Sequence, residues 1–464
     1  MMLWHNLFRT KPLHDFEKGS QLKRCLTAFD LTLLGIGAII GAGIFVLTGV
    51  AAATKAGPAI TLSYVIAGLA CAFSALCYAE LASSIGGSGS AYGYAYASLG
   101  EFVAWIIGWD LLLEYGASVP TIAIGWSGYL NNMLNATGLV IPLFLLKNPF
   151  EGGIINLPAM LIVLIVTLIL ALGVRFTAHL NAFMVLIKLL AIGLFVSIAA
   201  FYIEPANWHP FMPFGWGGVL HGAAFIFFAY IGFDAVSTAA EETLNPQRNL
   251  PIGIISSLII CTVIYILVAG LLTAVTSYTN LNVSSPVAEV LLKLGHKTAA
   301  GVISVGAIAG LTTVLLVMFY GYSRVIMAMA HDGMLPQLIG RIDAKTQAPT
   351  FIIVASGIVM ALIAGLTPID VMAEMVNIGT LAAFAIVCVG VIVLHYTKPN
   401  MPRPFKVPYK PLFPMLGAGL CLFLMVNLAA VTLLRFIIWL IIGLVIYFTY
   451  SRFHTRRSFE KIDN

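Results

Sequence analysis

Apolar runs of about twenty residues recur along almost the whole chain. An α-helix rises about 1.5 Å per residue, so a run of this length crosses about 30 Å of hydrocarbon. The pattern therefore predicts an all-α polytopic membrane protein. The twelve predicted spans are residues 29–54, 58–82, 99–127, 154–174, 179–203, 217–240, 250–277, 298–330, 350–367, 374–396, 411–432 and 434–452.

The composition excludes an ordinary soluble domain. Of the 464 residues, 60% are hydrophobic and 9% are charged, whereas a soluble domain carries roughly 25% charged residues. Residues 1–27 are basic and lack a short apolar stretch followed by a cleavage site, which predicts a cytoplasmic tail and no cleaved signal. The six cysteines show no metal-ligand spacing, so we predict packed thiols, and no metal or cofactor.

Lysine and arginine positions orient the spans. With both termini inside, inner segments hold 18 of the 24 lysines and arginines, outer loops hold five, and Lys188 lies within a span. This bias predicts a multi-pass protein of the cell (plasma) membrane with cytoplasmic tails at residues 1–27 and 453–464. The net charge of +5 thus reflects topology, and no nucleic acid partner is predicted.

Two spans contain signs of an interruption. The first span carries "GIGAIIGAGIF", with four glycines within nine positions, and the sixth places Gly232 close to Asp234. Interrupted helices at matching places in two halves are typical of inverted-repeat transporters. The alternative is close helix packing, because Gly37 and Gly41 are four residues apart and form a small-xxx-small pair.

An interrupted helix leaves main-chain N–H and C=O groups that need partners in hydrocarbon. A free amino acid carries the complementary groups. We therefore predict that the Ala42 and Gly43 N–H groups bind its carboxylate, because helix starts favour anions. The carbonyls of Ile39, Phe228 and Ile231 are predicted to bind its ammonium. We call the two interruptions the first and the second joint. Their predicted substrate-binding residues are Ile39, Ile40, Gly41, Ala42, Gly43, Phe228, Ala229 and Ile231.

Lys188, Asp234, Asp110 and Glu114 are charged residues inside predicted spans. Lys188 has apolar runs on both sides, and a charge at this depth costs from about 2.5 to more than 10 kcal/mol. It is predicted to exchange a proton or to act as a fixed cation; snorkelling to an interface is the alternative. Asp234 is its predicted acidic partner, and Asp110 and Glu114 share one helix face. We predict that Lys188, Asp234 and Glu114 carry proton coupling.

Three longer stretches resemble a known family. They are "FDLTLLGIGAIIGAGIFVLTG", "FFAYIGFDAVSTAAEE" with the following "LNPQRNLPIGI", and "YGYSRVIMAMAHDGMLP". Together they resemble the amino acid–polyamine–organocation superfamily, and more narrowly its bacterial cationic amino acid transporter branch, over about residues 25–450. The resemblance implies a LeuT-like fold with broken helices 1 and 6. Its parts would be inverted repeats at residues 28–203 and 204–397, followed by two C-terminal helices at 398–452.

The resemblance also implies alternating-access transport of L-amino acids. Phe228 would be a gating aromatic above the site. Lys188 would occupy the place where sodium-coupled relatives bind sodium, which implies proton coupling without sodium. One departure is Ala42, where relatives often have serine or threonine, so a hydroxyl contact with the substrate is absent.

Substrate selection rests on fewer residues. Met318 is a predicted pocket wall that would narrow the site, with ordinary packing as the alternative. No acidic residue is clearly committed to a substrate guanidinium. Small neutral amino acids such as alanine are therefore predicted ahead of arginine.

The sequence thus predicts a proton-coupled, sodium-independent L-amino acid importer. The alternatives are a cationic amino acid transporter, an obligate exchanger and a non-transporting sensor, and the short tails argue against the sensor. No HExxH or comparable catalytic motif is present, so no enzyme is predicted. The predicted partners are the amino acid, the proton and the lipid bilayer; a small membrane partner is left open.

Overall fold

The computed structural model describes residues 9–11, 25–85, 91–173, 178–239, 243–343, 346 and 348–455. Within these ranges the chain is helical, and its strand-like pairing is a single bridge. The main helices are α3 (Ala28–Ile39), α4 (Thr48–Ala51), α5 (Ile60–Ile85), α6 (Ala91–Ser98), α7 (Glu101–Ala136), α8 (Leu157–Ala171), α9 (Ala178–Ala199), α10 (Gly215–Ile226), α11 (Ala235–Thr238), α12 (Pro246–Val275), α13 (Pro286–Lys293), α14 (Lys297–His331), α15 (Thr350–Leu366), α16 (Ile369–Thr397), α17 (Leu412–Val426) and α18 (Ala430–Ile446).

Seven described helical segments are long and apolar enough to cross a membrane, and five shorter apolar helices accompany them. Every predicted span coincides with one of these helices or with a pair of half-helices. Some predicted ends were wrong. The predicted span 99–127 continues as α7 to Ala136, because the polar residues at its end are still compatible with a helix. The predicted span 411–432 ends at Val426, where Asn427 closes α17 with its Nδ2 2.8 Å from the Phe423 carbonyl.

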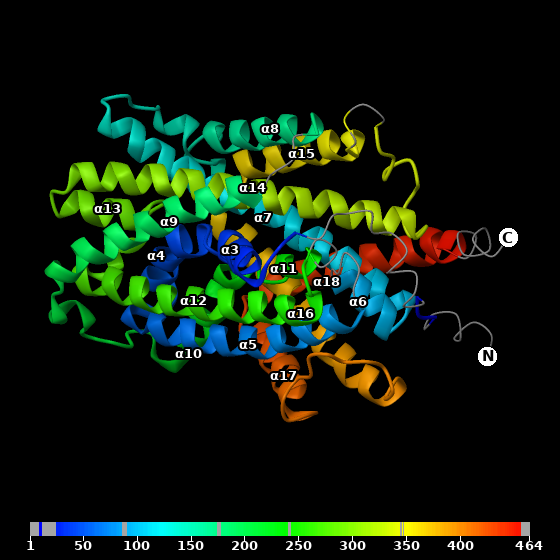
Figure 1. The fold of residues 1–464 in the computed structure, drawn as a ribbon. Coiled ribbons are helices and arrows are strands. Elements are labelled where there is room, and N and C mark those ends of the chain that lie inside the picture. Colours follow the sequence, from blue (N-terminus) through cyan, green and yellow to red (C-terminus); the bar gives the residue numbers. More distant parts are fainter. Residues whose placement is uncertain are drawn as a thin grey trace.

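The long helices run side by side in a bundle (Figure 1). Three pairs with extensive packing are α5 with α12, α7 with α14, and α8 with α15. Within each pair the two helices come from predicted spans that are five apart in the chain.

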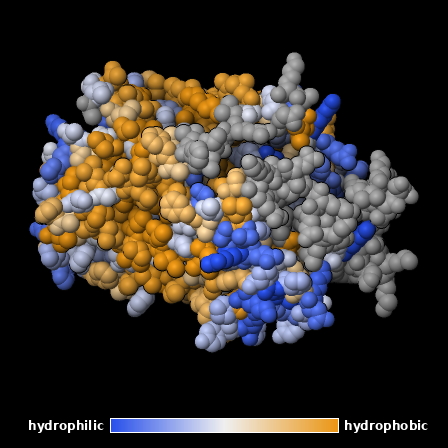
Figure 2. Space-filling model, viewed as in Figure 1, coloured by the Kyte–Doolittle hydropathy of each residue, from blue (hydrophilic) through white to orange (hydrophobic). Residues whose placement is uncertain are grey.

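The outside of the bundle is apolar. Figure 2 shows hydrophobic side chains over much of the visible face, with hydrophilic residues towards its edges. Leu186, Val263, Ile358 and Ile441, from four different helices, are about half exposed or more. Apolar exposure on this scale is what a lipid-facing surface requires.

The residues before α3 are paired with the segment between α11 and α12. Thr27 caps α3, and its side chain and that of Asp30 bond each other's main-chain N–H in a capping box. Just before the cap, Leu26 forms a parallel bridge with Thr243, and its carbonyl accepts a hydrogen bond from Leu244 N at 2.8 Å. This clasp, Leu26 with Thr243–Leu244, joins two segments that are more than 200 residues apart in the chain.

Candidate functional site

The first interruption lies at the glycine cluster. α3 ends at Ile39, Ile40 is extended (φ −75°, ψ 98°), and helix resumes at Ala42, with the π-helix η1 over Gly43–Leu47. The first hydrogen bond after the gap runs from Phe45 N to the Gly41 carbonyl at 3.3 Å. The N–H groups before Phe45 therefore lie at the free start of a helix, the positive end of its dipole.

The second interruption lies beyond the 3₁₀-helix η8 (Phe227–Tyr230), which follows α10. Ile231 is extended (φ −62°, ψ 136°), and Gly232 has φ 119°, a conformation that glycine adopts without strain. Asp234 accepts a hydrogen bond from Gly232 N at 3.2 Å, and α11 begins at Ala235. The Asp234 side chain thus hydrogen-bonds back to the second joint, which directly precedes it in the chain.

The two joints touch (Figure 1, α3 and α11 at the centre of the bundle). A methyl group on Gly43 would overlap the Cα and Cβ atoms of Ala229, and one on Gly232 would lie 2.8 Å from the Ala38 carbonyl. These two glycines therefore permit direct main-chain contact between segments from the two halves of the chain.

Tyr265 of α12 connects the joints. Its hydroxyl lies 2.8 Å from the Ile39 carbonyl and 2.7 Å from the Ala229 carbonyl. A tyrosine hydroxyl has one proton, so it donates to one carbonyl at a time. The Phe228 carbonyl, another of the predicted ammonium acceptors, accepts from Ile231 N at 3.2 Å.

Lys188 of α9 reaches the first joint. The side chain is fully buried, and Nζ donates to the Gly37 carbonyl at 2.7 Å and to the Ile40 carbonyl at 2.9 Å. These are the carbonyls at the C-terminal end of α3, where a cation offsets the helix dipole. The predicted pairing of Lys188 with Asp234 is not among the contacts of the described residues: Asp234 accepts hydrogen bonds from the Tyr115 hydroxyl at 3.2 Å and from Gly232 N.

Two further carboxyl groups of α7 are buried near this region. Asp110 and Glu114 are each 1% exposed, and none of their four side-chain oxygens has a hydrogen-bond donor within the described part of the chain. Asp110 lies against Gly379 of α16, where a methyl group would come 2.9 Å from its Oδ1. A negative charge held here without a partner would be expensive.

Met318 and Phe228 are buried at 3% and 7% exposure. α14 borders the first joint through Val314, whose methyl group would lie 3.2 Å from a Cβ on Gly41. Met318 is one turn along from Val314 on the same face of α14. The packing alternative describes Gly37 well, because it lies against Asn181 and Val185 of α9.

Sequence reasoning missed two side chains that support the joints. One is Tyr265, and the other is Asn377 of α16, whose Nδ2 donates to the Phe225 carbonyl at 2.6 Å. Both are polar groups inside apolar spans, and that signal was available. No cluster of three or more His, Cys, Asp or Glu suited to a metal occurs among the residues that the structure describes.

Comparison with known proteins identifies clear relatives. The family model for amino acid permeases matches residues 26–453. The chain is 49% identical over 460 residues to the branched-chain amino acid permease BcaP of Bacillus subtilis (strain 168), covering 97% of this chain and 99% of that protein. It is 48% identical over 455 residues to the methylthioribose transporter of the same organism, covering 97% and 99%. It is 36% identical over 415 residues to the human cationic amino acid transporter 4, covering 87% of this chain and 65% of that protein.

Proposed function

The chain belongs to the amino acid permease family, whose members are transporters and not enzymes, and we propose that it carries neutral L-amino acids across the cell membrane together with protons and without sodium. The observation that carries this proposal is the direct contact of two interrupted helices, with main-chain groups at both breaks. The ligand chemistry that complements these groups is one carboxylate and one ammonium.

The proposed architecture is a LeuT-like inverted repeat of twelve spans, with both tails in the cytoplasm. Its repeats are residues 28–203 and 204–397, followed by two helices in 398–452. The packing of α5 on α12, α7 on α14 and α8 on α15 supports it, because each pair joins corresponding members of the two repeats.

In the proposed binding mode the substrate carboxylate lies at the Ala42–Gly43 helix start. Its ammonium lies near the carbonyls of Ile39, Phe228 and Ile231. Two of these carbonyls already have protein donors, yet a carbonyl oxygen accepts two hydrogen bonds. Gly41 and Gly43 provide the close main-chain approach.

Side-chain selection is proposed to favour small and branched aliphatic amino acids. Met318 and Val314 present apolar surface on the α14 side of the first joint. The similarity to a branched-chain permease supports a neutral substrate. A hydrophobic wall distinguishes substrates that differ by one methylene by only about 1–3 kcal/mol, so a range of aliphatic side chains is expected.

Proton coupling is proposed to act through Lys188, with Asp234 and Glu114 as further exchange groups. A charged Lys188 ties the end of α3 to α9 through two charge-assisted hydrogen bonds. Loss of its proton weakens that tie, so protonation biases the position of α3. Two states that differ in proton affinity are what coupling requires.

The test uses purified protein in liposomes with tritiated L-alanine and L-leucine. We expect uptake to follow an imposed proton gradient and to be the same in sodium and potassium buffers. L-Arginine and methylthioribose, which test the cationic and sugar-derivative alternatives, are expected not to compete. Uptake that follows sodium refutes the coupling, robust counterflow with no net uptake indicates an exchanger, and binding without any transport indicates a sensor.

A further inference from the structure

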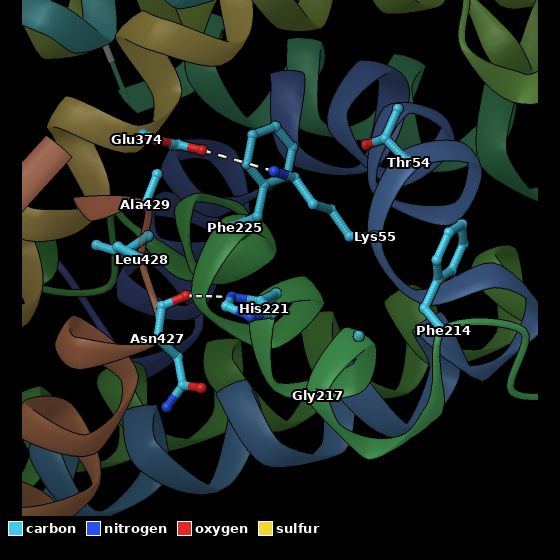
Figure 3. Close-up of a pocket in the computed structure, with 11 residues that line it drawn as sticks. Thr54, Lys55, Phe214, Gly217, His221, Phe225, Glu374, Asn427, Leu428 and Ala429 are labelled. Atoms are coloured by element: carbon cyan, nitrogen blue, oxygen red, sulfur yellow. Dashed lines mark hydrogen bonds and ion pairs between the residues drawn. The ribbon is translucent and has the colours of Figure 1, made fainter. Parts of the chain in front are cut away.

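A cavity of about 490 Å³, lined by both apolar and charged side chains, lies apart from the joints. Its walls come from η2 (Ala52–Ala56), α10, α16 and the turn between α17 and α18 (Figure 3). η2 continues the helix that begins at the first joint, and α10 leads into the second. The cavity is thus built from the far ends of both interrupted spans, towards the opposite end of the bundle from α6 (Figure 1).

The cavity contains one cation and one anion. Lys55 Nζ lies 3.8 Å from Glu374 Oε1, well beyond the 2.7–2.9 Å of a close charge-assisted hydrogen bond. Glu374 Oε2 accepts a hydrogen bond from Thr432, which fixes the carboxylate in place. The Lys55 side chain is 34% exposed and that of Glu374 is 13% exposed, so the loose pair is open to a ligand.

Aromatic side chains surround this pair. Lys55 Nζ lies 5.6 Å from the centre of the Phe225 ring, within cation–π range. Phe214 lines the other side of the cavity, and the His221 ring is held by a 2.6 Å contact between its Nδ1 and the Asn427 carbonyl. The lining therefore combines two opposite charges with apolar surface, the usual composition of a small-molecule site.

Phe225 lines this cavity and belongs to α10, the helix that leads to the second joint. It is 1% exposed, it precedes η8 by two residues, and its carbonyl is held by Asn377. A molecule in the cavity would therefore contact the helix that carries the second joint.

We propose that this cavity is a second, weaker binding site for zwitterionic amino acids, which holds the substrate before it reaches the joints. The substrate carboxylate pairs with Lys55 and its ammonium with Glu374, replacing one loose ion pair by two close ones. A ligand with a carboxylate but no ammonium pairs with Lys55 and leaves Glu374 facing a like charge. A ligand with an ammonium but no carboxylate pairs with Glu374 and leaves Lys55 facing a like charge. The inference rests on the proposed function, because it assigns the same substrate to both sites.

The test is equilibrium binding of tritiated L-alanine and L-leucine to the purified full-length protein. The wild type is expected to bind two molecules per chain, one more weakly than the other. The double variant Lys55→Met, Glu374→Gln is expected to lose the weak site and to keep the tight site with a Kd within twofold of wild type. The introduced glutamine keeps an oxygen for Thr432, and the introduced methionine keeps the aliphatic stem of the lysine.

Lys293→Met is the matched control, because Lys293 pairs with Glu289 on the surface of α13; two sites are expected to remain. L-Leucinamide, which lacks the carboxylate, is expected not to displace ligand from the weak site. A wild-type stoichiometry of one, or two sites in the double variant, overturns this inference and leaves the proposed function standing. Loss of the tight site in a double variant that melts like wild type also overturns it. Absence of binding by either amino acid in wild type refutes the proposed function itself.

Discussion

The contact between Gly43 and Ala229 makes Gly43→Ala the most informative single substitution. The added methyl group would overlap the Cα and Cβ atoms of Ala229 and lie 3.0 Å from its main-chain nitrogen. Two of these three atoms belong to the backbone, so a rotamer change cannot relieve the overlap. Overpacking of this kind costs about 1–3 kcal/mol.

The overlap is present with or without substrate and displaces the Ala42–Gly43 helix start from the second joint. If the joints form the substrate site, up to this penalty is expected to appear in substrate binding. A loss of about 1–3 kcal/mol corresponds to an uptake efficiency lower by about 5- to 150-fold. The assay is the initial rate of alanine and leucine uptake per reconstituted protein, measured over a range of substrate concentrations. The melting temperature of each variant is recorded in parallel to separate binding from folding.

Gly193→Ala is the matched control. Gly193 lies in α9, is exposed, and has no heavy atom within 4 Å of an added methyl group. The same substitution there is expected to leave uptake unchanged and to stabilise the helix by about 0.5–1 kcal/mol. Uptake by Gly43→Ala within twofold of wild type, with unchanged substrate affinity, would show that the joints are not the site.

Three further predictions concern other parts of the molecule. Lys188→Met removes two hydrogen bonds to the end of α3 and is expected to abolish the pH dependence of uptake, measured between pH 5 and 9; retained pH dependence excludes Lys188 from coupling. Met318→Ala is expected to widen the site, so that competition by bulkier amino acids rises while that by alanine changes little. Glu80→Gln breaks a buried network in which Glu80 meets His395 at 2.7 Å and Arg403 at 3.3 Å. Its cost of about 3–5 kcal/mol is expected to lower the melting temperature, whereas Glu289→Gln on the surface of α13 is expected to have no such effect.

The apolar pattern predicted the helices well because each span has to cross about 30 Å of hydrocarbon and must therefore be long and apolar. It also located both interruptions, since clustered glycines and an acid weaken a regular helix at one point of an otherwise apolar span. Helix ends such as Ala136 and Val426 were predicted poorly. They depend on local capping and on packing outside the hydrocarbon, which hydropathy does not report.

The hydrogen-bond partners of the buried charged residues could not be predicted from the sequence. Opposite charges suggested that Lys188 pairs with Asp234, but Lys188 binds main-chain carbonyls, and Asp234 binds Tyr115 and its own joint. Every residue carries a main-chain carbonyl, so the residue types do not show which carbonyls a buried lysine will bind. The bridging role of Tyr265 depends on α12 crossing both joints, which only the folded arrangement reveals.

The clasp between Leu26 and Thr243–Leu244 couples the residues before α3 to the residues between α11 and α12. α3 leads to the first joint, and α11 leaves the second. While this main-chain pairing holds, the clasped ends of the two segments move together. Independent movement of either segment first requires the pairing to break.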